Sequence, residues 1–198
     1  MRRTNPPRLL PDDSQFFLGI AEWYSPVVPG SGLHPRPGNA SSLQKYFPEI
    51  DPHNWLSIHY PSRKGESVEE VHGRIDGFLT DFGKLLPQLK AKGVDVRRPL
   101  FVSHAATVIV LVRSLTGDRE LPLRVGCCSL TELRPKGDGK GEEGLLGAYR
   151  GIKLADGAHL EKGADREWGM EDIEVEAGKA SYFINRTTSD CLLCLPGR

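Results

Sequence analysis

One histidine in this sequence stands where its chemistry could serve a ligand. His104 follows the apolar run 99–103 and precedes the small and apolar residues 105–115, after which comes Gly117. These patterns predict a short buried strand over 99–103 and a helix over 105–115 that ends at Gly117. In open α/β sheets, ligands bind where strands end, and the first turn of a helix offers free N–H groups to anions. We therefore expect His104 to face an anion rather than to act as a core or helix-capping histidine.

The element that must position such a site is the long helix predicted from Ser67 to about Lys92. Ser67 and Glu70 have the spacing of a capping box, in which each side chain satisfies a free backbone donor at the helix start. Gly93 should stop the helix, and Pro87 should kink it or end it early. Apolar residues recur in steps of three and four, which predicts one buried stripe: Val68, Val71, Ile75, Phe78, Phe82, Leu85 and Leu89.

Polar residues on and before this helix have simpler interpretations. Arg74 lies off the apolar stripe, and we expect it to face solvent, the alternative being that it reaches toward the site. Glu66 and Ser67 fit helix-start chemistry better than catalysis. We expect three further histidines to be surface residues: His34, His53 and His59. We expect the three tryptophans to be packing residues: Trp23, Trp55 and Trp168.

The remaining elements are shorter. The sequence predicts a strand over 127–135, an exposed turn over 136–144 and a strand over 145–154 that pairs with the first. A short helix within 41–47 would be capped by Ser41 or Ser42. Residues 1–15 are an irregular lead-in, and we expect 171–198 to be a weakly ordered tail.

Composition bounds the function classes. The 198 residues are enough for one domain, and 26 basic residues balance 26 acidic ones. A formal charge of zero gives no electrostatic reason to expect direct contact with nucleic acid or an anionic membrane. The sequence contains no stretch long enough to span a membrane and its start does not read as a secretory signal. We therefore expect an intracellular protein, cytoplasmic or nuclear.

The four cysteines suggest neither a disulfide framework nor a metal site. Cys127 and Cys128 are adjacent and are expected to be small buried hydrophobic residues. Cys191 and Cys194 form a single CxxC without the second pair that a zinc site requires, so a metal or redox role is the lesser alternative.

Several segments, in order, resemble the histidine phosphatase superfamily, the phosphoglycerate-mutase-like proteins. They are "LGIAEWY", "YPSRKGESVEEVHGRIDGFL", "LFVSHAATVIVLVRSLTGD", "CCSLTEL" and "DGAHLEKGADREWG". The resemblance covers residues 16–170. It is nearest to a eukaryotic branch with a Gly-x-x-Glu-Trp segment and a Ser-His-Ala-Ala segment, which includes a subunit of the fungal RNA polymerase III initiation factor C.

The resemblance implies a fold, a reaction and two site residues. The fold is α/β, an open sheet flanked by helices, and the reaction is phosphoryl transfer through a phosphohistidine, which needs no metal or organic cofactor. His104 matches the family's second histidine, which stands across the phosphate. Glu22 matches the proposed proton donor, and its place beside Trp23 and Tyr24 suggests a raised carboxyl pKa, as a general acid requires. The alternative for Glu22 is an ordinary surface acid in a loop.

The sequence departs from the family in one large respect: it contains no Arg-His-Gly, the motif of the nucleophilic histidine. The single His-Gly, His72-Gly73, lies within the predicted long helix, so the domain looks incomplete at its N-terminal side. Truncation, a shifted gene start and genuine divergence all remain open. Two functions follow. The first is a phosphatase-like protein that is inactive or nearly so and binds phosphate or a phosphomonoester at most weakly. The alternative is a non-catalytic interaction subunit with a protein partner, as in an RNA polymerase III transcription factor complex.

Overall fold

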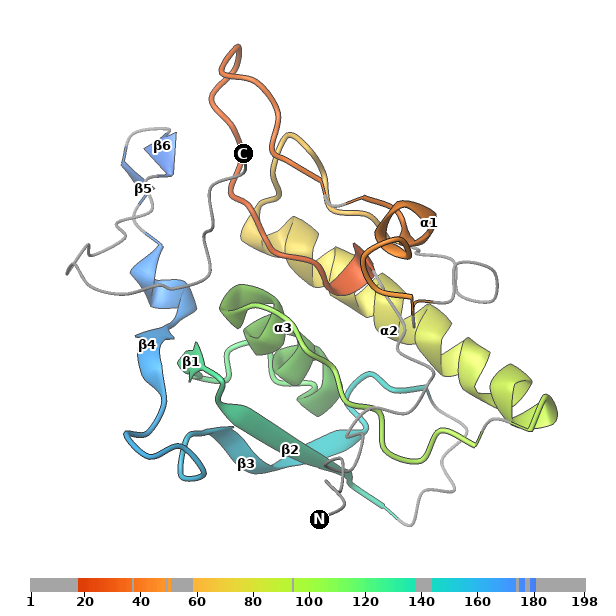
Figure 1. Cartoon of the computed structure of the whole chain (residues 1–198). Coiled ribbons are helices and arrows are strands. Elements are labelled where there is room, and N and C mark those ends of the chain that lie inside the picture. Colours follow the sequence, from red (N-terminus) through yellow and green to blue (C-terminus); the bar gives the residue numbers. More distant parts are fainter. Residues whose placement is uncertain are drawn as a thin grey trace, which may run out of the picture.

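The computed structural model describes residues 18–36, 38–48, 50, 59–93, 95–137, 144–173, 175–176 and 179–180, and Figure 1 shows their arrangement. Two α-helices dominate, and short antiparallel strands lie against one of them. The elements in chain order are η1 (Leu18–Ile20), α1 (Ala40–Leu43), α2 (Val68–Ala91), α3 (Ala105–Thr116), β1 (Val125–Cys127), β2 (Leu130–Pro135), β3 (Tyr149–Asp156), β4 (Asp165–Trp168), η2 (Met170–Asp172), β5 (Val175–Glu176) and β6 (Lys179–Ala180).

Helix α2 confirms the prediction for the long helix in its start and its stop, and in the buried stripe from Val71 to Leu89 with Leu85 half-buried; Val68 is the exception, because it is 40% exposed. The Ser67 side chain accepts from the backbone N–H of Glu70, and the Glu70 carboxylate accepts from the N–H of Ser67. Gly93 follows the C-cap in the left-handed conformation, with φ of 88°. Pro87 does not end the helix early, because the helix continues to Ala91. The missing N–H of one proline is tolerated so near a C-terminus, where the helix has only one more turn to run.

Helix α3 also forms as predicted, and it packs against α2. It ends at Gly117, which adopts the left-handed conformation with φ of 77° and donates its N–H to the carbonyl of Arg113. The two helices share a core that removes apolar surface from water and so holds them together. Its buried members are Trp23, Val71, Ile75, Phe78, Leu79, Phe82, Ala106, Val110 and Leu111.

The strands form three separate antiparallel pairs: β1 with β4, β2 with β3, and β5 with β6. The pairing of β2 with β3 confirms the predicted partnership of the two middle strands, with Leu133 opposite Gly151. In Figure 1 this hairpin lies beneath α3. The described residues thus make a mixed α/β architecture, and the open phosphoglycerate-mutase-like sheet remains a proposal.

The prediction of a short buried strand over 99–103 is wrong. This segment is extended, but it pairs with no other part of the chain that the structure describes. Leu100 and Val102 are 74% and 81% exposed, while Phe101 between them packs on Phe78 and Phe82. Exposed and packed side chains therefore alternate here as they do in a strand. The segment is not a β-strand, because no neighbouring strand forms hydrogen bonds with it among the described residues.

Three local predictions also need correction. The strand expected over 127–135 is broken, because Cys128 has φ of 59° and separates β1 from β2. This turn leaves Cys127 and Cys128 exposed rather than buried. The short helix α1 is capped by Asn39, whose Oδ1 accepts from the N–H of Ser42 at 2.9 Å, rather than by a serine. Asparagine is as good a cap as serine, so composition alone does not choose between neighbours.

Candidate functional site

The structure brings together the two residues that the sequence proposed for one site. His104 Nδ1 lies 2.8 Å from Glu22 Oε2, although the residues are far apart in the chain. The side chains are 58% and 35% exposed, so the pair lies at the surface and is not sealed in the core. His104 uses one ring nitrogen for this contact, and Nε2 has no partner among the described residues.

Two hydroxyl groups on either side of His104 fix the segment that carries Glu22. Ser103 Oγ donates to the carbonyl of Ile20 at 2.6 Å, and Thr107 Oγ1 donates to that of Ala21 at 2.9 Å. His104 itself is the N-cap of α3, but its side chain makes no capping hydrogen bond. Because the ring does not cap the helix, it is available to Glu22.

The environment of Glu22 affects its acidity in the direction that the sequence suggested. Burial raises the pKa of the Glu22 carboxyl, and the charges of His104 and Arg74 and the N–H of Trp23 act in the opposite direction. Trp23 N–H donates to Glu22 Oε1 at 3.1 Å. The arrangement is a carboxyl group and an imidazole that can share a proton at a partly open surface.

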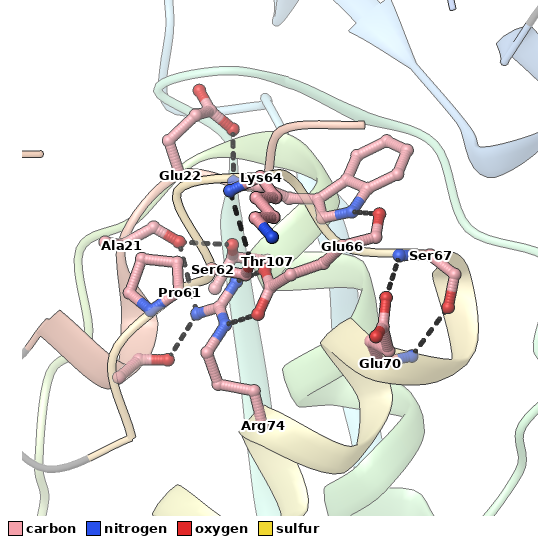
Figure 2. A network of polar contacts seen from close by, with 12 residues as sticks. Ala21, Glu22, Pro61, Ser62, Lys64, Glu66, Ser67, Glu70, Arg74 and Thr107 are labelled. Atoms are coloured by element: carbon pink, nitrogen blue, oxygen red, sulfur yellow. Dashed lines mark hydrogen bonds and ion pairs between the residues drawn. The ribbon is translucent and has the colours of Figure 1, made fainter. Parts of the chain in front are cut away.

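Arg74 is not the solvent-facing arginine that the sequence predicted. Its side chain is 4% exposed and holds the 6% exposed carboxylate of Glu66 through two hydrogen bonds of 2.7 and 2.8 Å. Arg74 Nη1 also donates to the carbonyl of Gly19 at 2.6 Å. Figure 2 shows this guanidinium between the Glu66 carboxylate and the backbone that leads to Glu22.

The sequence contained a signal for this burial. Arg74 lies three residues after Val71 and four before Phe78, and these steps place it on the buried face of α2. Glu66 has a different role from the expected helix cap. The cap belongs to Ser67 and Glu70, while the Glu66 carbonyl accepts from Trp23 Nε1 at 2.8 Å.

A second set of backbone contacts fixes the loop after Glu22. The N–H of Glu66 donates to the carbonyl of Tyr24, and the N–H of Val27 donates to that of Lys64, each at 2.8 Å. Gly65 lies between them with φ of 86°, and a Cβ there would meet the Ser25 carbonyl oxygen at 2.1 Å. Only glycine allows the two segments to approach so closely.

The other histidines and tryptophans have mainly structural contacts. His34 stacks on Tyr24, and His59 contacts Asp81 at 2.9 Å, so both are partly buried rather than free at the surface. Trp23 is buried and Trp168 packs against it, as expected for packing residues. The predictions for His53, Trp55, Cys191, Cys194 and residues 1–15 lie outside the described residues.

Within the described ranges, no three or more histidine, cysteine, aspartate or glutamate side chains come together as metal ligands would. None of the helices in those ranges has the length and apolar character needed to cross a bilayer.

The comparisons with known proteins give one informative similarity. No protein-family model matches this chain. The chain is 31% identical over 121 residues to the transcription factor tau 55 kDa subunit of Saccharomyces cerevisiae. The matched region is 57% of this chain but only 27% of the yeast protein, so the chain spans about a quarter of the length of that relative. The similarity connects this chain with a transcription factor subunit.

Proposed function

We propose that this protein is a non-catalytic interaction subunit of a transcription factor complex of the kind that serves RNA polymerase III. The observation that carries the proposal is the 31% identity to the yeast transcription factor subunit. The Gly-x-x-Glu-Trp and Ser-His-Ala-Ala segments resemble the same branch of proteins. On this proposal the protein works in the nucleus, among other subunits.

The geometry at His104 supports binding rather than catalysis. Transfer through a phosphohistidine requires an attacking histidine, and the chain contains no Arg-His-Gly. His72, the histidine that precedes a glycine, is part of α2 and is contacted by Arg119. His104 contacts Glu22 through Nδ1, and the resemblance gives it the place of the family's second histidine, not that of the nucleophile. These residues therefore supply a surface pair without the nucleophile that would use it.

The exposed apolar residues of 99–103 support a protein partner. The side chains of Leu100 and Val102 are exposed. The backbone N–H and C=O groups of 99–103 form no backbone hydrogen bond with any other part of the chain that the structure describes. An extended segment of a partner subunit can dock on such a backbone by adding a strand, with alternate side chains covered in the process. On this proposal the occupant is a strand from another subunit of the complex.

Co-purification tests the proposal. The tagged chain is expressed in fungal cells, and mass spectrometry identifies the proteins recovered with it. We expect transcription factor subunits with the wild-type chain, and their loss with the double variant Leu100→Asp/Val102→Asp. Leu33→Asp, which also alters an exposed apolar side chain, is the matched control and should retain them. A monomer that recovers no such subunit would contradict the proposal.

Phosphomonoester hydrolysis is the second candidate, and the contact of Glu22 with His104 is the observation that favours it. An assay of the purified chain with p-nitrophenyl phosphate separates the two. We expect no turnover above that of the buffer, since the nucleophile motif is absent from the chain. Robust turnover that His104→Ala abolishes would establish the enzyme instead.

A further inference from the structure

Two irregular segments, 24–36 and 60–66, run side by side next to the start of α2 (Figure 1). The backbone N–H of His34 donates to the carbonyl of Arg63 at 2.8 Å. The His34 ring also contributes, because its Nε2 donates to the carbonyl of Ser25 at 2.8 Å. These hydrogen bonds join the two segments, so the side chains that they carry outward have a fixed backbone beneath them.

The outer surface of these segments carries positive charge only. From residue 23 to residue 65, the part of the chain that the structure describes contains no acidic residue but four basic ones: Arg36, Lys45, Arg63 and Lys64. All four are exposed, and none forms an ion pair with a carboxylate that the structure describes. The whole sequence has equal numbers of basic and acidic residues, so this excess of one sign is local.

Several exposed arginines elsewhere on the protein have carboxylate partners, which offset their charge. They are Arg97, Arg119, Arg124 and Arg134. The guanidinium groups of Arg36 and Arg63 differ from these four in having only neutral partners.

Those neutral contacts hold both guanidinium groups in place. Arg36 Nη2 donates to the Pro61 carbonyl at 2.6 Å, and Arg36 Cζ lies 5.2 Å from the centre of the Tyr60 ring. Arg63 Nε donates to the His34 carbonyl at 3.1 Å. A guanidinium has five N–H groups, so each arginine keeps donors for a ligand. A side chain that is ordered before binding loses less conformational entropy when the ligand arrives.

We propose that Arg36, Arg63 and Lys64 form a docking surface for an acidic peptide segment of a partner protein. Arginine clusters recognise acidic motifs in this way, and the planar guanidinium matches the two oxygens of a carboxylate. The Tyr60 ring, which is 50% exposed, offers apolar surface to the aliphatic part of the peptide side chains. The surface uses none of the residues of the proposed strand-docking site, so the inference goes beyond the proposed function and does not depend on it.

The number of charges favours a peptide over a nucleic acid. Proteins that bind DNA through its backbone typically neutralise about 6–10 phosphates with lysine and arginine. The surface described here offers four cations on a chain without net charge. A few carboxylates of a peptide need no more than that.

The experiment is fluorescence anisotropy of a short fluorescein-labelled polyglutamate peptide, titrated with the purified chain at neutral pH and low ionic strength. We expect saturable binding that weakens as salt is added, because salt screens exposed charges. A polyglutamine peptide of the same length tests whether charge is required, and a labelled single-stranded oligonucleotide tests the other polyanion.

The variant Arg36→Gln/Arg63→Gln should weaken polyglutamate binding about tenfold, the combined effect of losing two exposed ion pairs. The matched control is Arg150→Gln/Lys162→Gln, which removes the same charge from two exposed side chains elsewhere and should leave the affinity unchanged. Arg36→Lys/Arg63→Lys keeps the charge but loses the planar donors, so it should also weaken binding, by a smaller factor. Circular dichroism checks that each variant is folded, because both arginines contact backbone carbonyls.

Four results would overturn the proposal. They are equal binding of polyglutamine, undiminished binding by a folded Arg36→Gln/Arg63→Gln variant, an equal loss in the matched control, and tighter binding of the oligonucleotide than of polyglutamate. If the glutamine variant does not fold, unchanged affinity in Arg36→Lys/Arg63→Lys has the same consequence. The proposed function is tested separately, since co-purification depends there on Leu100 and Val102.

Discussion

The guanidinium of Arg74 and the carboxylate of Glu66 form a two-pronged ion pair inside the protein, with both side chains almost fully buried. Arg74 also binds the Gly19 carbonyl, and Glu66 receives the indole N–H of Trp23 through its own carbonyl. The pair thus joins the start of α2 to the segment that carries Glu22. It is part of what holds the candidate site in place.

Removing one partner of this pair should be strongly destabilising. We expect Arg74→Met to lower the free energy of unfolding by about 3–5 kcal/mol, because the Glu66 carboxylate is left buried without its counter-charge. Urea denaturation measures the change. The double variant Arg74→Met/Glu66→Leu should lose less than the sum of its single variants, since no charge is then stranded.

The control for this prediction is the exposed pair of Arg134 and Glu132. Arg134→Ala should change the free energy of unfolding by no more than about 0.5 kcal/mol, as is usual at the surface. If Arg74→Met had an effect as small as this, the buried pair would not have the structural role described here.

The pair of Glu22 and His104 should be visible in a carboxyl titration. Burial raises the pKa of Glu22, and the charge of His104 partly offsets that increase. His104→Gln should therefore raise the Glu22 pKa further, which ¹³C NMR of the side-chain carboxyl measures. An unchanged or lower pKa would show that the two groups do not interact in solution.

The raised pKa of Glu22 also affects stability in a defined direction. The unfolded chain loses this proton near the ordinary value of 4.5, whereas the folded chain retains it to higher pH. The folded state thus binds more protons in this window, and its stability falls as pH rises from 4.5 through the folded pKa. Glu22→Gln should remove this component from a series of urea denaturations at different pH.

His72 should give the opposite pH dependence. Burial lowers the pKa of His72, and the charges of Arg119 and Arg113 lower it further, against the weaker influence of Asp76 and Glu69. Below the ordinary value of 6.5 the unfolded chain binds a proton that the folded chain resists, so stability is lost as pH falls through that range. Denaturation at pH 7.5 and at pH values below 6.5 measures it.

His72→Gln is the variant that isolates this group, because glutamine can accept a hydrogen bond but does not titrate. Its stability should change less with pH than that of the wild-type protein over the same range. The same slope in both proteins would mean that His72 is protonated as easily in the folded chain as in the unfolded one.

Cys127 and Cys128 should react in the native protein. Both are exposed at the turn between β1 and β2. A maleimide added without denaturant should therefore modify the peptide that contains them, as mass spectrometry of a digest would detect. Cys127→Ser/Cys128→Ser removes that modified peptide and serves as the control. Modification that required denaturant would place the thiols in the interior, as the sequence had suggested.

Helices were the most predictable part of this fold, because their signals are local. The capping box at Ser67 and the glycine at 117 fixed the limits of α2 and α3 within a residue or two. The pairing of β2 with β3 followed from two adjacent strand patterns. The segment 99–103 was not predictable in this way, because a strand requires a neighbour and a sequence pattern does not show whether one is present.

The two residues of the candidate site, Glu22 and His104, could be predicted from the sequence, but the residues that hold them in place could not. A resemblance placed Glu22 and His104 in one site, and the structure brings them into contact. The burial of Arg74 was not predicted, because a charged side chain was expected to face solvent. Its spacing from Val71 and Phe78 on α2 nevertheless indicated the buried face. The burial of Glu66 beside Arg74 could not be foreseen either, since it depends on how the segment before α2 packs against residues 19–24.

The close approach at Gly65 has a practical consequence for the segment that runs beside it. The N–H groups of Val27 and His34 are fixed on the carbonyls of Lys64 and Arg63, and the turn between them extends outward with open space around Gly30 and Gly32. An epitope or fluorescent label inserted between these two glycines would be anchored on both sides, so it can report on the protein in a cell without disturbing the fold.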